Sequence, residues 1–143
     1  MKTSARNQFS GIVSRIQEGA VNAEVELTLD SGQQIIAMIT RASVVRLGLQ
    51  IGKPAFALVK ASTVVLVTDI QGAVFSTRNM LDGTVAELRK GAVNSEVIIQ
   101  LAEGGTVAAI VTNESATSLG LQPGAPVTAI FKTSSVIVGV IQS

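Results

Sequence analysis

Six polar side chains in the first half of this chain recur in the second half, each 72 residues further on. Each set holds four hydroxyls, one guanidinium and one ammonium, with no carboxylate and no imidazole. Such a set donates hydrogen bonds and carries two positive charges. It suits a small oxyanion of charge −2, because a buried anion must be both neutralised and hydrogen-bonded. The two sets are Ser4, Arg6, Thr40, Ser43, Lys60 and Ser62, and Ser76, Arg78, Thr112, Ser115, Lys132 and Ser134.

The same inventory argues against catalysis. It contains no nucleophile beside a base and no paired carboxylates for acid–base chemistry. The chain has no Cys and no His, so a disulfide framework and a thiolate metal site are excluded, and nitrogen-ligated zinc, copper or iron is not expected. We therefore predict a binding protein and no enzyme, with no metal cation held directly by protein ligands.

A repeat supplies the elements that must position these residues. Residues 4–68 align with residues 76–140 without a gap, and such self-similarity has to be recognised before a fold is assigned. We predict two domains, 1–69 and 73–143. The connection at residues 69–75 is short and partly apolar, so we expect the two units to pack together.

Each repeat has mainly the pattern of β-strands. Apolar and polar residues alternate along the second expected strand, which indicates one buried face. Five short strands with one short helix between the third and the fourth are typical of an OB-type barrel. The sequence therefore predicts an all-β fold of two tandem OB-like five-stranded barrels, each with one short helix. The expected strands are 11–17, 21–29, 34–40, 54–60 and 63–67 in the first repeat, and the last three of the second are 106–112, 126–132 and 135–140.

The expected helices place two hydroxyls of each set. The segments 40–48 and 112–120 begin with Thr as the N-cap and end with Gly in the left-handed C′ position. Backbone N–H groups and the dipole at a helix start favour an anion, and here the start is Thr40-x-x-Ser43. The Lys-x-Ser segment falls at a corner between the last two strands, from which backbone N–H groups can also point inward.

The composition predicts an oligomer without nucleic-acid or membrane partners. Hydrophobic residues make up 47% and charged residues 15%, where soluble domains carry roughly 25% charged residues, so there is too little charge to coat two separate small domains. The net charge of +1 and the lack of Tyr and Trp disfavour nucleic-acid binding, which needs a basic groove and aromatic platforms. No apolar run approaches the roughly 18–20 residues of a membrane-spanning helix, and the N-terminus lacks the apolar core of a signal peptide. We expect a cytoplasmic protein.

Four motifs, taken together, resemble the molybdenum-binding-protein (Mop) domain. They are Ser-Ala-Arg-Asn at 4–7, Gly-Ala-Val-Asn-x-Glu at 19–24, Thr-x-x-Ser at 40–43 and Lys-Ala-Ser at 60–62. Because two copies cover nearly all of it, the chain resembles the di-domain molbindins, which have two Mop/TOBE-type domains. That resemblance implies OB-like barrels assembled as a trimer of two-domain chains. It also implies non-enzymatic intracellular storage and homeostasis of molybdate, with tungstate bound similarly.

The resemblance further implies two classes of molybdate pocket. One lies between barrels and combines the Ser-x-Arg and Lys-x-Ser elements of one barrel with the Thr-x-x-Ser helix start of a neighbour. Carried over to this chain, it comprises Ser4, Arg6, Thr40, Ser43, Lys60, Ala61 and Ser62, with Ser76, Arg78, Thr112, Ser115, Lys132, Thr133 and Ser134. The other lies near the threefold axis and uses mainly backbone N–H groups; it comprises Ala20, Val21, Asn22, Ala92, Val93 and Asn94.

The second copy departs from the family pattern at two positions and differs from the first copy at a third. Thr77 and Thr133 stand where the motif has Ala, and Ser95 replaces the Ala of the first copy. Where such a position contributes only its backbone N–H, the pocket survives with an extra hydroxyl nearby; where space is tight, it binds more weakly. Glu24 and Glu96 should pair with a basic side chain or a backbone donor, because a carboxylate ligand would repel molybdate.

Plainer interpretations and other functions stay open. Thr40 and Thr112 cap a helix in any case, and Asn22 and Asn94 fit a turn as well as an axial site. A ligand-sensing or partner-binding OB module without nucleic-acid contact is the main alternative to storage. A nucleic-acid-binding OB barrel is a third hypothesis, and its binding should weaken steeply with salt, whereas an enclosed oxyanion site should be much less sensitive.

Overall fold

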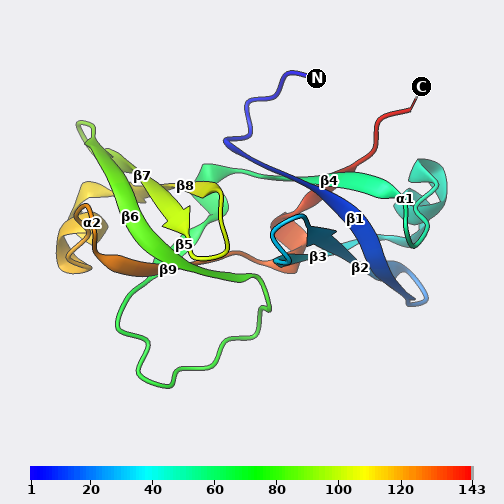
Figure 1. Ribbon diagram of the computed structural model, residues 1–143, viewed down its shortest axis with the longest axis horizontal. Coiled ribbons are helices and arrows are strands. Elements are labelled where there is room, and N and C mark those ends of the chain that lie inside the picture. Colours follow the sequence, from blue (N-terminus) through cyan, green and yellow to red (C-terminus); the bar gives the residue numbers. More distant parts are fainter. Residues whose placement is uncertain (143) are drawn as a thin grey trace.

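Two five-stranded antiparallel sheets form the protein, and each is curled into a half-barrel (Figure 1). The computed structural model describes residues 1–142. The predicted all-β class with two five-stranded units is confirmed. The first repeat holds β1 (Asn7–Glu18), β2 (Asn22–Leu29), β3 (Gln34–Thr40), β4 (Pro54–Val59) and β5 (Val65–Val67); the second holds β6 (Met80–Lys90), β7 (Asn94–Leu101), β8 (Thr106–Thr112), β9 (Pro126–Ile130) and β10 (Ile137–Gly139). The helices are α1 (Arg41–Leu47) and α2 (Asn113–Ser118), and 3-10 turns η1 (Ala61–Thr63) and η2 (Thr133–Ser135) precede the fifth strands.

The two repeats exchange their last strands. The strand order is β10-β4-β1-β2-β3 in one sheet and β5-β9-β6-β7-β8 in the other. Each sheet therefore takes four strands from one repeat and one from the other. We call the first sheet with α1 barrel A and the second sheet with α2 barrel B. The repeats of the sequence and the barrels of the structure thus have different boundaries, and the chain after η2 returns to the first repeat (Figure 1).

Alternating apolar residues build the core. In β2, Val25 and Leu27 are buried, while Glu26 between them lies on the outer face and is half-buried. The buried faces of the two barrels join in one hydrophobic cluster. The rings of Phe9 and Phe131, which come from different repeats, stack in this cluster with their centroids 6.5 Å apart. The barrels consequently share a core.

Both helices begin as the sequence predicts. The side chains of Thr40 and Thr112 cap the first turns. Gly48 (φ 65°) and Gly120 (φ 67°) take the left-handed backbone after the last turns, a conformation that strains most other residues. The Thr-x-x-Ser segments are therefore held at well-defined helix starts in both barrels.

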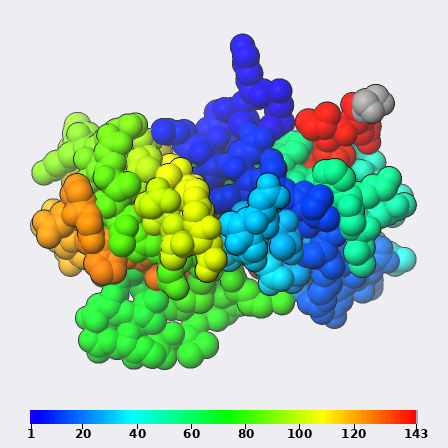
Figure 2. Space-filling view, in the orientation of Figure 1, coloured from blue at the N-terminus to red at the C-terminus, as the bar shows by residue number. Residues whose placement is uncertain are grey.

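The connection between the repeats, residues 69–75, loops away from both barrels; the chain then returns to the junction at residues 76–79 and enters β6 (Figure 1). In the space-filling view the barrels touch, and the N-terminal segment, in blue, lies across their junction (Figure 2). The expected packing of the two units is observed, although exchanged strands and shared core residues, and not the connection, hold them together. Among residues 1–142 no helix is long and apolar enough to cross a membrane.

Candidate functional site

The hydroxyls of the Thr-x-x-Ser segments form identical arrangements at the two helix starts. The Thr40 hydroxyl donates to Ser43 Oγ at 2.8 Å and accepts the Ser43 backbone N–H at 3.1 Å. The corresponding distances for Thr112 and Ser115 are 2.9 and 3.0 Å. Because each hydroxyl has one proton and the threonine has used its own, the serine proton is directed elsewhere. Each helix start therefore offers a serine O–H donor to an external acceptor.

The axial motif lies beside the same helix start. The Gly19 N–H donates to the Asn22 carbonyl at 2.7 Å, and the Arg41 N–H donates to the Val21 carbonyl at 2.8 Å. Asn22 pairs with Thr40 across β2 and β3. In barrel B the same register pairs Asn94 with Thr112, and the same two backbone bonds recur. The two classes of predicted site thus meet at one end of each barrel.

A pocket of about 450 Å³ opens at this end of barrel A. Its lining includes Ala20, Val21 and Asn22 of the axial motif, together with Glu24 and Met38. Val21 is 71% exposed, and its counterpart in barrel B, Val93, is 70% exposed. The axial motif therefore presents an apolar side chain to the outside of the single chain in both copies.

The predicted guanidinium groups reach across from one repeat to the other barrel. Arg6 is ion-paired with Glu96 on β7, and Arg78 is ion-paired with Glu24 on β2. This observation agrees with the expectation that the two glutamates pair with basic side chains. It also means that the groups predicted to hold an oxyanion hold a carboxylate in the single chain.

Each of these glutamates has a second arginine from its own barrel. Arg15 Nη1 lies 3.7 Å from Glu24 Oε1, and Arg89 Nη1 lies 2.9 Å from Glu96 Oε1. Arg89 also donates to Glu87, and this hydrogen bond lowers the pKa of the Glu87 carboxyl and raises the pKa of the Arg89 guanidinium. The charge cluster is consequently larger in barrel B than in barrel A.

Two buried asparagines were missed as key residues by the sequence analysis. The Asn7 side-chain amide donates to the Ala108 carbonyl and accepts the Ala108 N–H, both at 2.8 Å. Asn79 makes the same pair of bonds to Ile36 on β3, at 2.7 and 2.8 Å. A side-chain amide here takes the place of a neighbouring strand at a sheet edge. Their signal in the sequence is that each follows the repeated Arg directly, as part of Ser-x-Arg-Asn.

The Lys-x-Ser corners complete the cross-repeat arrangement. η1 packs against β8 and η2 packs against β3, the strands that end at Thr112 and Thr40. Lys60 and Lys132 are exposed and form no ion pair with a residue in the range 1–142. The serines of the elements from both repeats, Ser4, Ser62, Ser76 and Ser134, are exposed as well.

These contacts group the predicted residues into two equivalent sets. The Ser-x-Arg and Lys-x-Ser elements of the first repeat both lie against barrel B, which carries the Thr112 helix start. Those of the second repeat lie against barrel A, which carries the Thr40 helix start. Each set therefore draws its cationic residues from one repeat and its helix-start hydroxyls from the other.

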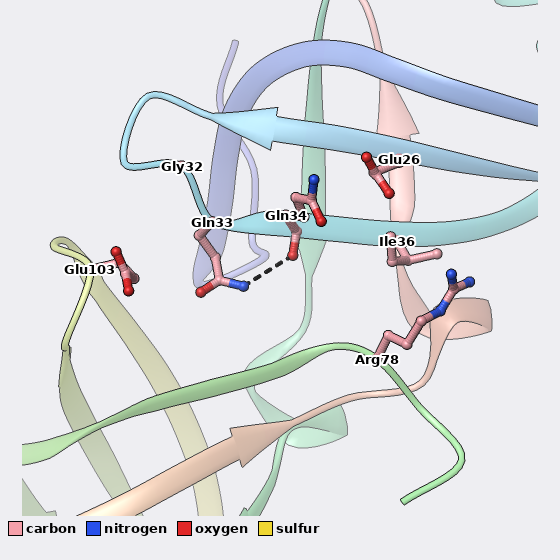
Figure 3. A pocket seen from close by; sticks show the side chains of 7 residues that line it. All are labelled: Glu26, Gly32, Gln33, Gln34, Ile36, Arg78 and Glu103. Atoms are coloured by element: carbon pink, nitrogen blue, oxygen red, sulfur yellow. Dashed lines mark hydrogen bonds between the residues drawn. The ribbon is translucent and has the colours of Figure 1, made fainter.

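One pocket between the barrels is unsuited to an oxyanion. It has a volume of about 330 Å³ and is lined by Arg78 together with Glu26, Glu103 and Ile36 (Figure 3). The lining carries two carboxylates and a single guanidinium, so a dianion would meet net repulsion. The serines and lysines of the predicted sites do not line this pocket.

Two of the three changes in the second copy have hydrogen-bond partners in the structure. The Thr77 hydroxyl donates to the Phe131 carbonyl at 2.8 Å and accepts the Asn79 N–H at 3.1 Å. The buried Ser95 hydroxyl donates to Asn113 Oδ1 at 2.5 Å. Thr133 is half-buried, whereas Ala61 in the first copy is buried. Two of the three substitutions therefore add local hydrogen bonds.

Comparison with known proteins gives a consistent family. A family model described as "TOBE domain" matches residues 3–66 and 76–138. The molybdenum transport protein ModE of Azotobacter vinelandii is 48% identical over 140 residues, which cover 98% of this chain and 52% of that protein. The molybdenum-pterin-binding protein MopA of Rhodobacter capsulatus is 45% identical over 137 residues, with 96% and 52% coverage. The chain spans about half the length of these curated relatives.

A solved structure matches the chain along its whole length. It is the cytoplasmic molybdate-binding protein ModG with molybdate bound, with a TM-score of 0.96 and 48% sequence identity, and the match covers 99% of this chain and 100% of that one. The two chains therefore share the same overall arrangement of two barrels. The protein belongs to the TOBE-domain family, with two such domains and with Mop- and ModE-type molybdenum-binding proteins among its relatives.

Proposed function

We propose that this protein binds molybdate, with tungstate as an analogue, and stores it without catalysing a reaction. The observation that carries the proposal is the full-length likeness to ModG, whose structure contains molybdate. This chain has hydroxyl, guanidinium and ammonium donors in two equivalent sets. Such groups can both neutralise and hydrogen-bond an oxyanion. The solved relative is described as cytoplasmic, and we propose the same compartment for this chain.

We assign the between-barrel pockets to the two cross-repeat sets and the axial pockets to the Ala-Val-Asn turns. The first class comprises Ser4, Arg6, Thr40, Ser43, Lys60, Ala61 and Ser62, with Ser76, Arg78, Thr112, Ser115, Lys132, Thr133 and Ser134. The second comprises Ala20, Val21 and Asn22, with Ala92, Val93 and Asn94. In the single chain most of these residues are exposed, so the pockets need further walls.

A homotrimer would supply those walls. Large apolar side chains are exposed at equivalent positions of the two repeats, namely Val21 with Val93, Met38 with Ile110, and Val65 with Ile137. Exposed apolar residues that repeat in register mark surfaces that associate. Six barrels would then surround the pockets, and the sequence units 1–69 and 73–143 would occupy equivalent places in the assembly. No nucleic-acid or membrane partner is part of this proposal. The DNA-binding activity named for the longer ModE of Escherichia coli (strain K12) is not carried over to this chain.

The test is native mass spectrometry of the purified protein with and without molybdate, in excess sulfate. A trimer that gains several discrete molybdate masses supports storage in interface pockets. A trimer that gains none contradicts the proposal and leaves the sensing or partner-binding alternative. A monomer that gains molybdate contradicts the interface pockets alone.

A further inference from the structure

We propose that Glu24 and Glu96 are built-in competitors of the bound anion: they hold the anion-binding guanidinium groups of Arg78 and Arg6 until an oxyanion displaces them. This inference deepens the proposed function and rests on it. It assigns an affinity-setting role to two acidic residues that lie among cationic ones.

The carboxylates are placed as competitors would be. Glu24 and Glu96 are largely covered, with side chains 22% and 15% exposed, whereas Arg78 and Arg6 are about half exposed. Each guanidinium is therefore open to a ligand from the solvent while it is ion-paired on its inner side. A carboxylate and a tetrahedral oxyanion present the same kind of acceptor oxygen to a guanidinium fork, so one can replace the other.

The competitors also lie next to the predicted anion positions. Glu96 is two residues from Asn94 on β7, about 7 Å along the strand, and Asn94 pairs with Thr112 at the helix start. Glu24 lines the pocket at the axial motif of barrel A, together with Asn22. An anion that contacts either arginine or either axial turn consequently lies within range of a negative charge that opposes it.

Breaking these ion pairs does not require the barrels to separate. The junction is held independently by the buried amides of Asn7 and Asn79 and by the exchanged strands. After displacement, each glutamate keeps the arginine of its own barrel, Arg15 or Arg89. The carboxylate is therefore never left without a cation, and the exchange of partners costs less than the loss of an ion pair.

The chemical consequence is selection by charge and concentration. A dianion is attracted to the guanidinium about twice as strongly as a carboxylate or a singly charged anion at the same distance. The competitor thus rejects monoanions and raises the dianion concentration at which the pockets fill. It also favours release when the free anion becomes scarce.

The experiment compares molybdate titrations of full-length variants by isothermal calorimetry in sulfate-free buffer. Glu24→Gln with Glu96→Gln, which keeps shape but removes charge, should bind molybdate on the order of tenfold more tightly, equivalent to about 1.4 kcal/mol. Arg15→Gln with Arg89→Gln should bind severalfold more weakly, because each glutamate then holds only the site arginine. The charge control Asp69→Asn, on the exposed connection where Asn tolerates the left-handed backbone (φ 55°), should bind as the wild type does.

The outcomes separate the two proposals. A wild type that binds no molybdate overturns the proposed function and this inference with it. A wild type that binds, together with a Glu24→Gln/Glu96→Gln variant that binds equally or more weakly, overturns only this inference. If that variant fails to fold, the Arg15→Gln/Arg89→Gln pair decides: weaker molybdate binding supports competition, and unchanged binding overturns it.

Discussion

Barrel A and barrel B carry the same contacts where they meet and different contacts on their outer strands. At the junction, Asn7 and Asn79 make matching amide pairs, and each of the two repeated arginines reaches a glutamate of the opposite barrel. On the outer face, barrel B has the ion pair of Glu87 with Arg89, while the aligned residues of barrel A are Arg15 and Gln17. The amide pairs and the arginine–glutamate ion pairs that cross the junction are thus kept in both copies, whereas the ion pair on the outer strand is not.

This difference indicates that residues at the junction are more constrained than residues on the outer strands. Two outer strands can vary independently, because each faces solvent. A contact across the junction constrains one residue in each repeat. A site formed twice at the interface places that constraint on both copies. The following changes break or sharpen this comparison between the barrels.

The largest expected effect comes from the buried asparagines. Asn7→Ala and Asn79→Ala should each lower the free energy of unfolding by roughly 2–6 kcal/mol, because the N–H and carbonyl of Ala108 or Ile36 lose their partners at about 1–3 kcal/mol each. Urea unfolding followed by circular dichroism measures the loss. Equal losses for the two variants would support equivalent junctions. Gln8→Ala, at an exposed neighbouring position, should change stability by less than about 0.5 kcal/mol.

The sequence predicted what is local and missed what is long-range. Thr40 caps a helix through a bond to Ser43, three residues away, so pattern and geometry coincide there. The strand exchange has no such short-range signal, because β5 and β10 are both short apolar strands and their partner strands lie far away in the sequence or in the other repeat. The role of Asn79 was missed for the same reason: its partner, Ile36, lies on the other repeat. The residue types of Arg6 and Arg78 were enough to predict that they bind an anion. Only the structure shows that they are paired with glutamates in the single chain.

The next effect concerns molybdate binding by the two arginines. Arg6→Ala and Arg78→Ala should each weaken molybdate binding at one of the two equivalent sets of between-barrel pockets about tenfold to a hundredfold, since a hydrogen bond to a charged group contributes about 1.5–3 kcal/mol. Calorimetry measures affinity, and circular dichroism checks that the barrels stay folded. Arg46→Ala, at the exposed end of α1, is the matched control. Unaltered molybdate uptake in the double variant would refute the site assignment.

The two single variants also test whether the copies are equivalent as binding sites. If the pocket at Thr133 is as open as the pocket at Ala61, Arg6→Ala and Arg78→Ala should lose equal numbers of bound anions. Native mass spectrometry counts the anions that remain. Unequal losses would show that the extra methyl and hydroxyl of the second copy alter the pocket. Thr133→Ala should then restore the equality.

A third change addresses the strand exchange itself. Gly139 on β10 faces Phe56 on β4, and a Cβ at Gly139 would lie 2.4 Å from the ring. The matching position in barrel B pairs Val67 with Thr128. Exchanged pairing thus places a glycine opposite the large ring, whereas pairing within each repeat would place Val67 there. This complementarity of size favours the exchanged pairing.

Gly139→Val should therefore destabilise the protein by about 1–3 kcal/mol through overpacking. Adding Phe56→Thr, which copies the Val–Thr pair of barrel B, should recover most of that loss. Urea unfolding of the two single variants and the double variant gives the coupling energy. A coupling energy near zero would mean that the size of the residue at position 139 and the Phe56 ring contribute to stability independently.

The smallest expected effect belongs to the outer strand of barrel B. The pKa of Glu87 is lowered in the folded protein, chiefly by the hydrogen bond from Arg89. A group with a lowered folded pKa contributes stability at pH values above its unfolded pKa, about 4.3 for Glu, and this contribution disappears as the pH falls through the folded pKa. The wild type should thus be slightly more stable than Glu87→Gln at neutral pH, and the difference should vanish in acid.

Barrel A supplies the control for that measurement. There Arg15 donates to the neutral Gln17 amide at 2.7 Å, which has no proton to gain in the acidic range. The stability change caused by Gln17→Ala should consequently be the same at neutral and at acidic pH. If Gln17→Ala showed the same loss in acid as Glu87→Gln, the pH dependence would belong to the strands in general and not to the Glu87 carboxyl. Because both residues are exposed and neither crosses the junction, both effects should remain far below those of the asparagines, as the comparison of the two barrels requires.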